Sequence, residues 1–197
     1  ILSEIISCQI GVEEGAYLKP LESPFRHRVV FHGSSFTHGV STSRAGLSYP
    51  MQFMRNTGIQ VLPLGVSGKC TMQPYFAEIL KDVAADAFVF DSFSNPMPAK
   101  MKRNFRNFLD TLIEAHPGKP IVFQRSIYRE RRNYDTRTDA IERSRRDMSE
   151  TLMEEISHDP KYRDVYFIDT NASVPSHETT VDGVHPNDYG YYLWYKS

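Results

Sequence analysis

Two segments at opposite ends of the sequence carry side chains suited to nucleophilic catalysis. Ser34 and Ser35 follow Gly33 in a stretch rich in glycine, serine and threonine, where a serine hydroxyl could act as a nucleophile. Asp182 precedes His185 by three residues, so one short loop can bring a carboxylate and an imidazole together. In that arrangement the carboxylate orients the ring, and the other ring nitrogen takes the serine proton. Taken singly, each of these strings is more often ordinary loop structure.

Two further segments could stabilise the negative charge that acyl transfer places on a carbonyl oxygen. Gly68 ends a Val-Ser-Gly run, where the missing side chain lets a backbone N–H group approach a ligand closely. Asn95 could donate a side-chain N–H to the same oxyanion, although a loop Asn commonly caps its own backbone. Together the four segments supply a nucleophile, a base, an orienting acid and oxyanion donors. This combination predicts an acyl-transfer site.

Regular elements must position these segments, and strand and helix signals alternate along the chain after residue 27. The alternation indicates βαβ units and a parallel sheet. Ligands of such sheets bind outside the carboxyl ends of the strands, which is where the candidate segments are expected. We expect strands at 28–31, 59–64, 87–90, 121–123 and 165–168, a loop at 33–48, and helices at 50–55, 73–84, 101–113, 137–157 and 188–196.

On these residues the chain resembles the SGNH hydrolase superfamily, also called GDSL-type esterases and lipases, over residues 28–195. The resemblance implies an α/β fold, namely a three-layer α/β/α flavodoxin-like fold with a parallel five-stranded sheet. The pattern is similar to a subgroup with Gly-Ser-Ser in its first block, whereas the wider family has Asp at the place of Ser34. Asn95 also lacks the usual Gly before it and Asp after it. The family blocks match Gly33-Ser34-Ser35, Gly68, Asn95, and Asp182 with His185.

The resemblance implies a serine esterase that needs no cofactor and no metal ion. Ser35 would be the nucleophile, His185 the base and Asp182 the acid that holds the ring. The N–H groups of Ser35, Gly68 and Asn95 would form the oxyanion hole. The implied substrate is a small-molecule or carbohydrate ester with a short acyl group such as acetate. Two alternatives use the same scaffold: a catalytically silent module that binds glycans, and an acyltransferase that uses the same residues.

Further polar residues near these segments are candidates for substrate contact. Arg125 and Arg129 follow the fourth predicted strand and could hold an anionic or sugar substrate, although solvated loop charges have the same sequence pattern. Ser34 is a third candidate. His32 and His38 flank the serine turn, but no third ligand stands at a metal-binding spacing. We therefore interpret both histidines as loop or pocket-wall residues.

Composition and charge narrow the class of protein. The chain has 197 residues with 23 basic and 24 acidic side chains, so no strong global charge favours nucleic acid. No apolar stretch is long enough to span a membrane. We expect a lead-in or linker at 1–27, which could be the remnant of a connection to a preceding domain, and a catalytic domain at 28–197.

The first residue and the cysteines bear on the cellular compartment. The sequence starts at Ile1 rather than Met, which indicates a processed or trimmed product. We therefore expect a secreted or periplasmic protein if an export signal has been removed, and a cytoplasmic one otherwise. Cys8 and Cys70 could form one disulfide or none.

Overall fold

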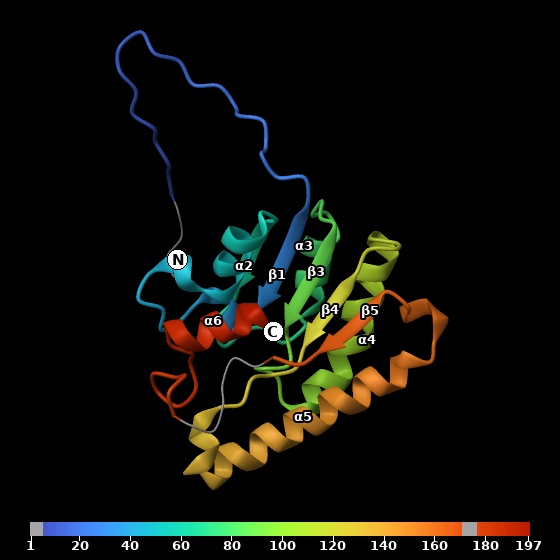
Figure 1. The fold of residues 1–197 in the computed structure, drawn as a ribbon. Helices are drawn as coiled ribbons and strands as arrows, with labels where there is room; N and C mark the ends of the chain where they lie inside the picture. The colour runs from blue at the N-terminus through green and yellow to red at the C-terminus, as the bar shows by residue number, and fades with distance from the viewer. Residues whose placement is uncertain (1–5, 171–176) are drawn as a thin grey trace.

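A computed structural model describes residues 6–170 and 177–197 of the chain. Its strands form one five-stranded sheet in the order β2-β1-β3-β4-β5, and every neighbouring pair is parallel (Figure 1). This confirms the predicted α/β fold with a parallel sheet. The strands are β1 (Arg28–Gly33), β2 (Gln60–Gly65), β3 (Ala87–Asp91), β4 (Ile121–Gln124) and β5 (Val165–Ile168).

Helices cover both faces of the sheet (Figure 1). Successive side chains of a strand point to opposite faces, so Val30 packs into one apolar cluster while Val29 and Phe31 pack into another. The first cluster lies under α3, α4 and α5, and the second under α1, α2 and α6. The α-helices are α1 (Ser35–His38), α2 (Tyr49–Thr57), α3 (Pro74–Leu80), α4 (Pro98–Ala115), α5 (Thr136–Ser157) and α6 (Asp188–Lys196), with short 3-10 helices η1 (Ala45–Leu47), η2 (Glu130–Asn133) and η3 (Pro160–Tyr162).

Three of the differences between the observed and the predicted elements lie near the site or in the helices that cover the core. The segment 33–48, expected as a loop, contains the single-turn helix α1 and the turn η1. Helix α3 ends at Leu80 although the apolar pattern continues to Val83, because Val83 packs against the core from the turn that follows. Helix α4 starts earlier than its apolar pattern, at Pro98, since proline suits a first helical turn.

The lead-in contains neither helix nor strand over residues 6–27, and nearly all of these residues are exposed. Its division from a catalytic domain at 28–197 stays a prediction. Among the described residues, no helix combines the length and the apolar character that crossing a bilayer requires.

Candidate active site

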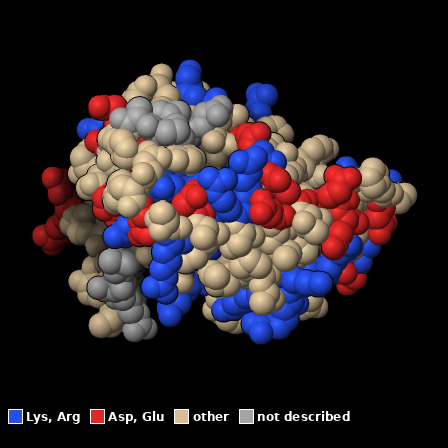
Figure 2. Space-filling view, turned by 90° about the horizontal axis from the view of Figure 1, so that it is seen from below, with Lys and Arg blue, Asp and Glu red and all other residues tan. Residues whose placement is uncertain are grey.

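The carboxyl ends of β1, β2 and β3 lie at one level of the sheet, at the end from which Figure 2 views the molecule. The register shows this directly, because Gly33 pairs with Gly65 on one side and with Asp91 on the other. Since β1 lies between β2 and β3, the Gly68 turn and the Asn95 segment follow the strands on either side of the serine turn. The sheet order therefore gathers three of the four predicted segments.

The serine turn begins at a glycine that no other residue could replace without a clash. A Cβ atom on Gly33 would lie 2.1 Å from Thr37 Oγ1 and 2.8 Å from Asp91 Cβ. The next residue, Ser34, is the N-cap of α1, and its hydroxyl oxygen accepts a hydrogen bond from the Phe36 N–H at 3.1 Å. Ser35 therefore becomes the first residue of α1, directly after the strand.

Ser35, His185 and Asp182 form one hydrogen-bonded chain. Ser35 Oγ lies 3.1 Å from His185 Nε2, and His185 Nδ1 lies 2.8 Å from Asp182 Oδ2. Because a carboxylate only accepts hydrogen bonds, Nδ1 carries the proton and Nε2 is free to accept one from the serine. This is the nucleophile–base–acid geometry that the sequence predicts for these residues.

The second carboxylate oxygen of Asp182 shapes the loop that carries the histidine. Oδ1 accepts the backbone N–H groups of Val184 at 2.9 Å and His185 at 2.7 Å. Burial alone would raise the pKa of Asp182, but the hydrogen bonds from His185 and Val184 outweigh it and hold the pKa below its usual value. Asp182 is therefore ionised at neutral pH and acts as a fixed acceptor for the ring.

A buried glutamate that the sequence analysis missed anchors the loop that carries His185. Glu130 is 1% exposed and accepts the Thr179 N–H at 3.0 Å and the Thr179 hydroxyl at 2.7 Å, together with the Thr180 hydroxyl. The adjacent Arg131 N–H donates to Gly183 O at 2.8 Å. One acidic residue within an arginine-rich stretch has no distinguishing local pattern, so only its contacts identify it.

The predicted oxyanion donors stand in three different settings. The Ser35 N–H is in the first turn of α1, where helices leave N–H groups without internal partners. Gly68 lies in an exposed turn with φ of +67°, a conformation that favours glycine. Asn95 is half-buried, and its Oδ1 atom has no hydrogen-bond partner among the described residues. The oxyanion role of these groups stays a prediction.

Ser34 is held by the protein's own groups, and its predicted contact with substrate stays a prediction. Ser34 is fully buried, and its hydroxyl donates to Asp91 Oδ2 while its oxygen accepts the Phe36 N–H. No hydroxyl proton is left for a substrate or for His185. This geometry favours Ser35 over Ser34 as the nucleophile.

The two arginines predicted to contact substrate are bound to the protein's own acidic groups. The Arg125 guanidinium pairs with Asp169 and, at 3.4 Å, with Glu150. Arg129 donates to Glu142 Oε1 at 2.8 Å and is only 11% exposed. Figure 2 shows Lys and Arg side chains gathered on this face with Asp and Glu among them. Both arginines are thus held by ion pairs, and their contact with substrate stays a prediction.

The remaining polar candidates are buried or lie in a cavity wall. His32 is in β1, and its Nδ1–H donates to Leu64 O at 2.9 Å. His32 and His38 both line a cavity, as expected for pocket-wall histidines. No cluster of three or more His, Cys, Asp or Glu side chains that could hold a metal occurs in the part of the chain that the structure describes. Cys8 and Cys70 are both free thiols.

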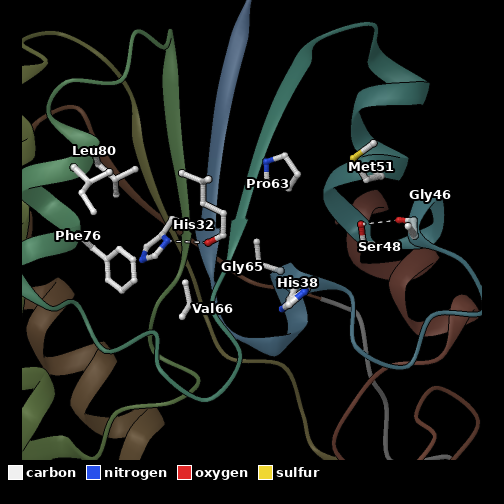
Figure 3. A pocket seen from close by; sticks show the side chains of 14 residues that line it. His32, His38, Gly46, Ser48, Met51, Pro63, Gly65, Val66, Phe76 and Leu80 are labelled. Carbon is white, nitrogen blue, oxygen red and sulfur yellow. Dashed lines mark hydrogen bonds between the residues drawn. The ribbon is translucent and has the colours of Figure 1, made fainter. Parts of the chain in front are cut away.

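This cavity of about 570 Å³ runs along β2 beside α1 (Figure 3). Figure 3 shows Phe76 on one side of β2 and Met51 on the other, with Pro63 from the strand itself between them. His38 marks its end nearest the serine turn, but Ser35 does not line it. The cavity is thus next to the site and not part of the hydrogen-bonded chain.

Known proteins share this fold. A protein of Bacteroides ovatus described as a GDSL-like lipase is 33% identical, with a TM-score of 0.85, over 94% of this chain and 55% of that one. A salicylyl-acyltransferase from a tetracycline biosynthetic pathway is 18% identical, with a TM-score of 0.72, over 89% and 53% of the two chains. A family two carbohydrate esterase from Cellvibrio japonicus is 15% identical, with a TM-score of 0.65, over 90% and 61%.

The chain thus spans little more than half the length of the first two of these structures. None of the curated proteins matches it at the level of sequence. The family model described as GDSL-like Lipase/Acylhydrolase family matches residues 26–196, nearly the whole chain. The chain belongs to this GDSL-like lipase/acylhydrolase family.

Proposed function

We propose that the protein is a metal-independent serine esterase that removes short acyl groups, such as acetate, from carbohydrate esters. The observation that carries the proposal is the hydrogen-bonded chain from Ser35 Oγ through His185 to Asp182, at 3.1 and 2.8 Å. A serine with a free imidazole nitrogen beside it and a carboxylate behind the ring is the arrangement that activates a hydroxyl for attack on a carbonyl.

The reaction proceeds in two halves. His185 Nε2 takes the Ser35 proton as Oγ attacks the ester carbonyl, and the N–H groups of Ser35, Gly68 and Asn95 stabilise the oxyanion. His185 then gives that proton to the leaving alcohol oxygen, the C–O bond to the alcohol breaks, and an acyl-enzyme remains. In the second half His185 removes a proton from water, hydroxide attacks the acyl carbon, and Ser35 recovers its proton as the acid leaves.

The substrate class rests on the resemblance to carbohydrate esterases and on the exposure of the site. Asp182 and Gly68 are exposed, whereas Ser35 itself is only 6% exposed, so exposed loop residues border a largely buried nucleophile. A bulky sugar alcohol can reach such a site, while the small acyl group needs little room of its own. These features favour a short acyl group on a large alcohol.

One set of measurements tests the proposal. The protein and its Ser35→Ala variant are treated with a fluorophosphonate, and the modified residue is mapped by mass spectrometry. The same pair is assayed on p-nitrophenyl acetate, butyrate and octanoate and on acetylated manno- and xylo-oligosaccharides. We expect labelling of Ser35, fastest release from the acetate esters, and loss of both in the variant.

The alternatives give different results in the same assays. A silent glycan-binding module would bind oligosaccharides without labelling or turnover. An acyltransferase would pass the acyl group to an added alcohol faster than to water. Absence of labelling in the unaltered protein would overturn the esterase proposal.

A further inference from the structure

One buried carboxylate joins the serine turn to the Asn95 segment. Asp91 is the last residue of β3 and is 1% exposed. Its Oδ2 atom accepts the Ser34 N–H at 3.1 Å and the Ser34 hydroxyl, and its Oδ1 atom accepts the Ser94 hydroxyl. Each carboxylate oxygen therefore holds the residue immediately before a proposed catalytic group, because Ser34 precedes Ser35 and Ser94 precedes Asn95.

The direction of these hydrogen bonds makes Asp91 an acceptor on both sides. The Ser34 oxygen already accepts the Phe36 N–H at 3.1 Å, so its single proton is donated to Asp91. Thr37 Oγ1 lies 3.5 Å from the same carboxylate oxygen. An ionised carboxylate can satisfy all of these donors at once, whereas an amide can accept through one oxygen only.

The ionised form of Asp91 carries a cost in the folded protein. Burial raises the pKa of Asp91, and the hydrogen bonds from Ser34 and Ser94 offset this only in part. A carboxyl group whose pKa is raised on folding makes the folded protein less stable above its ordinary titration range. A residue that lowers the stability of the folded protein in this way is expected where it holds the geometry of a functional site.

The Asn95 segment has other supports, and one of them, Arg129, also lies over the Phe36 ring of α1, 5.3 Å from the ring centre. Arg129 Nη2 donates to Ser94 O at 2.6 Å, and Arg145 Nη2 donates to Asn95 O at 3.0 Å. Both arginines share the Glu142 carboxylate, which ties the segment to α5. Asp91 accepts hydrogen bonds from Ser34 in the serine turn and from Ser94 in the Asn95 segment, so it fixes these two segments relative to each other.

We propose that Asp91 is a positioning residue that sets the distance between the Ser35 and Asn95 oxyanion donors by binding Ser34 and Ser94. The role rests on the proposed esterase function, because it acts through groups that this function uses. A displacement of about 1 Å in such a site can cost about 100-fold in rate, so a loss of this relative placement is measurable.

The test compares Asp91→Asn with a matched control, Asp110→Asn. Asp110 lies on α4, where it accepts the Tyr162 hydroxyl at 2.8 Å and pairs with Lys161 at 2.9 Å, both outside the serine turn and the Asn95 segment. We expect Asp91→Asn to lower kcat on p-nitrophenyl acetate by about 10- to 100-fold with KM nearly unchanged. The melting temperature of both variants is measured as well, so that kcat is expressed per folded molecule. Asp110→Asn should keep kcat within about twofold.

Hydrogen–deuterium exchange provides a readout that does not depend on turnover. In Asp91→Asn the peptides that cover 33–39 and 92–97 should both exchange faster, whereas Ser34→Ala should affect the first peptide more than the second. Unchanged exchange in both peptides, or a kcat within about twofold of the unaltered protein, would overturn the positioning role. A loss of kcat that is fully explained by the unfolded fraction of the Asp91→Asn variant would also overturn the positioning role. If the unaltered protein takes no fluorophosphonate label, the esterase proposal fails, and the exchange result still decides the role of Asp91.

Discussion

Acidification should weaken the fold in part through the buried histidine His32. Its ring is 1% exposed and lies between Phe76 and Phe90, with centroid distances of 4.6 and 6.1 Å. Burial lowers its pKa to about 4, although the hydrogen bond to Leu64 O acts in the opposite direction. The folded protein therefore holds His32 neutral where the unfolded chain, with an ordinary value of about 6.5, already takes up a proton.

The sign and size of the effect follow from this difference. Because the unfolded chain binds the proton more readily, stability is lost as the pH falls below about 6.5, and the loss is complete below about 4. At about 1.36 kcal/mol for each pH unit, the full loss is about 3 kcal/mol. At about pH 5 the His32 contribution to the loss is about 2 kcal/mol, a large fraction of the stability of a typical domain.

Urea unfolding near pH 7 and near pH 5 measures this quantity in the unaltered protein and in His32→Asn. The Asn amide can still donate to Leu64 O but takes up no proton, so the variant should lose about 2 kcal/mol less than the unaltered protein on acidification. Its smaller side chain lowers stability at both pH values alike and leaves the difference intact. If the two proteins lose stability in parallel, the proposed burial of a neutral His32 is wrong.

Four substitutions address the site itself. Ser35→Ala should lower kcat by about three to six orders of magnitude, whereas Ser34→Ala should mainly cost about 1 kcal/mol of stability through the lost cap. Steady-state kinetics with p-nitrophenyl acetate and mapping of the fluorophosphonate label distinguish the two serines. A label on Ser34 would reverse the assignment. Asp182→Asn should lower kcat by up to about four orders of magnitude, because the amide would donate to His185 Nδ1 and move the ring proton to Nε2. A rate near that of the unaltered protein would mean that Asp182 only accepts the backbone N–H groups of its own loop. Glu130→Gln should lower the melting temperature by about 2–8 °C and kcat by about tenfold, because it weakens the acceptor that anchors the loop of His185. An unchanged kcat with a lower melting temperature would show that Glu130 stabilises the fold without positioning the site.

Local patterns in the sequence were sufficient to predict most of the fold. β-branched and aromatic runs gave the parallel strands, since such runs suit a sheet covered on both faces. The predicted strand at 165–168 has the observed bounds of β5, and the other strands differ by at most two residues at either end. Chemistry-bearing residue types also pointed to the serine turn after the first strand and to Asp182 with His185, and the family resemblance implied Ser35 as the nucleophile.

Tertiary contacts alone decided the roles of the other polar residues. Ser34 and Ser35 are indistinguishable by type and neighbourhood, and it is Asp91, far along the chain, that takes the Ser34 proton and leaves Ser35 to His185. Glu142 likewise binds Arg129, which local sequence left as a candidate for substrate contact. Hydrogen bonds of this kind depend on sheet order and helix packing, which bring together side chains that no local spacing relates.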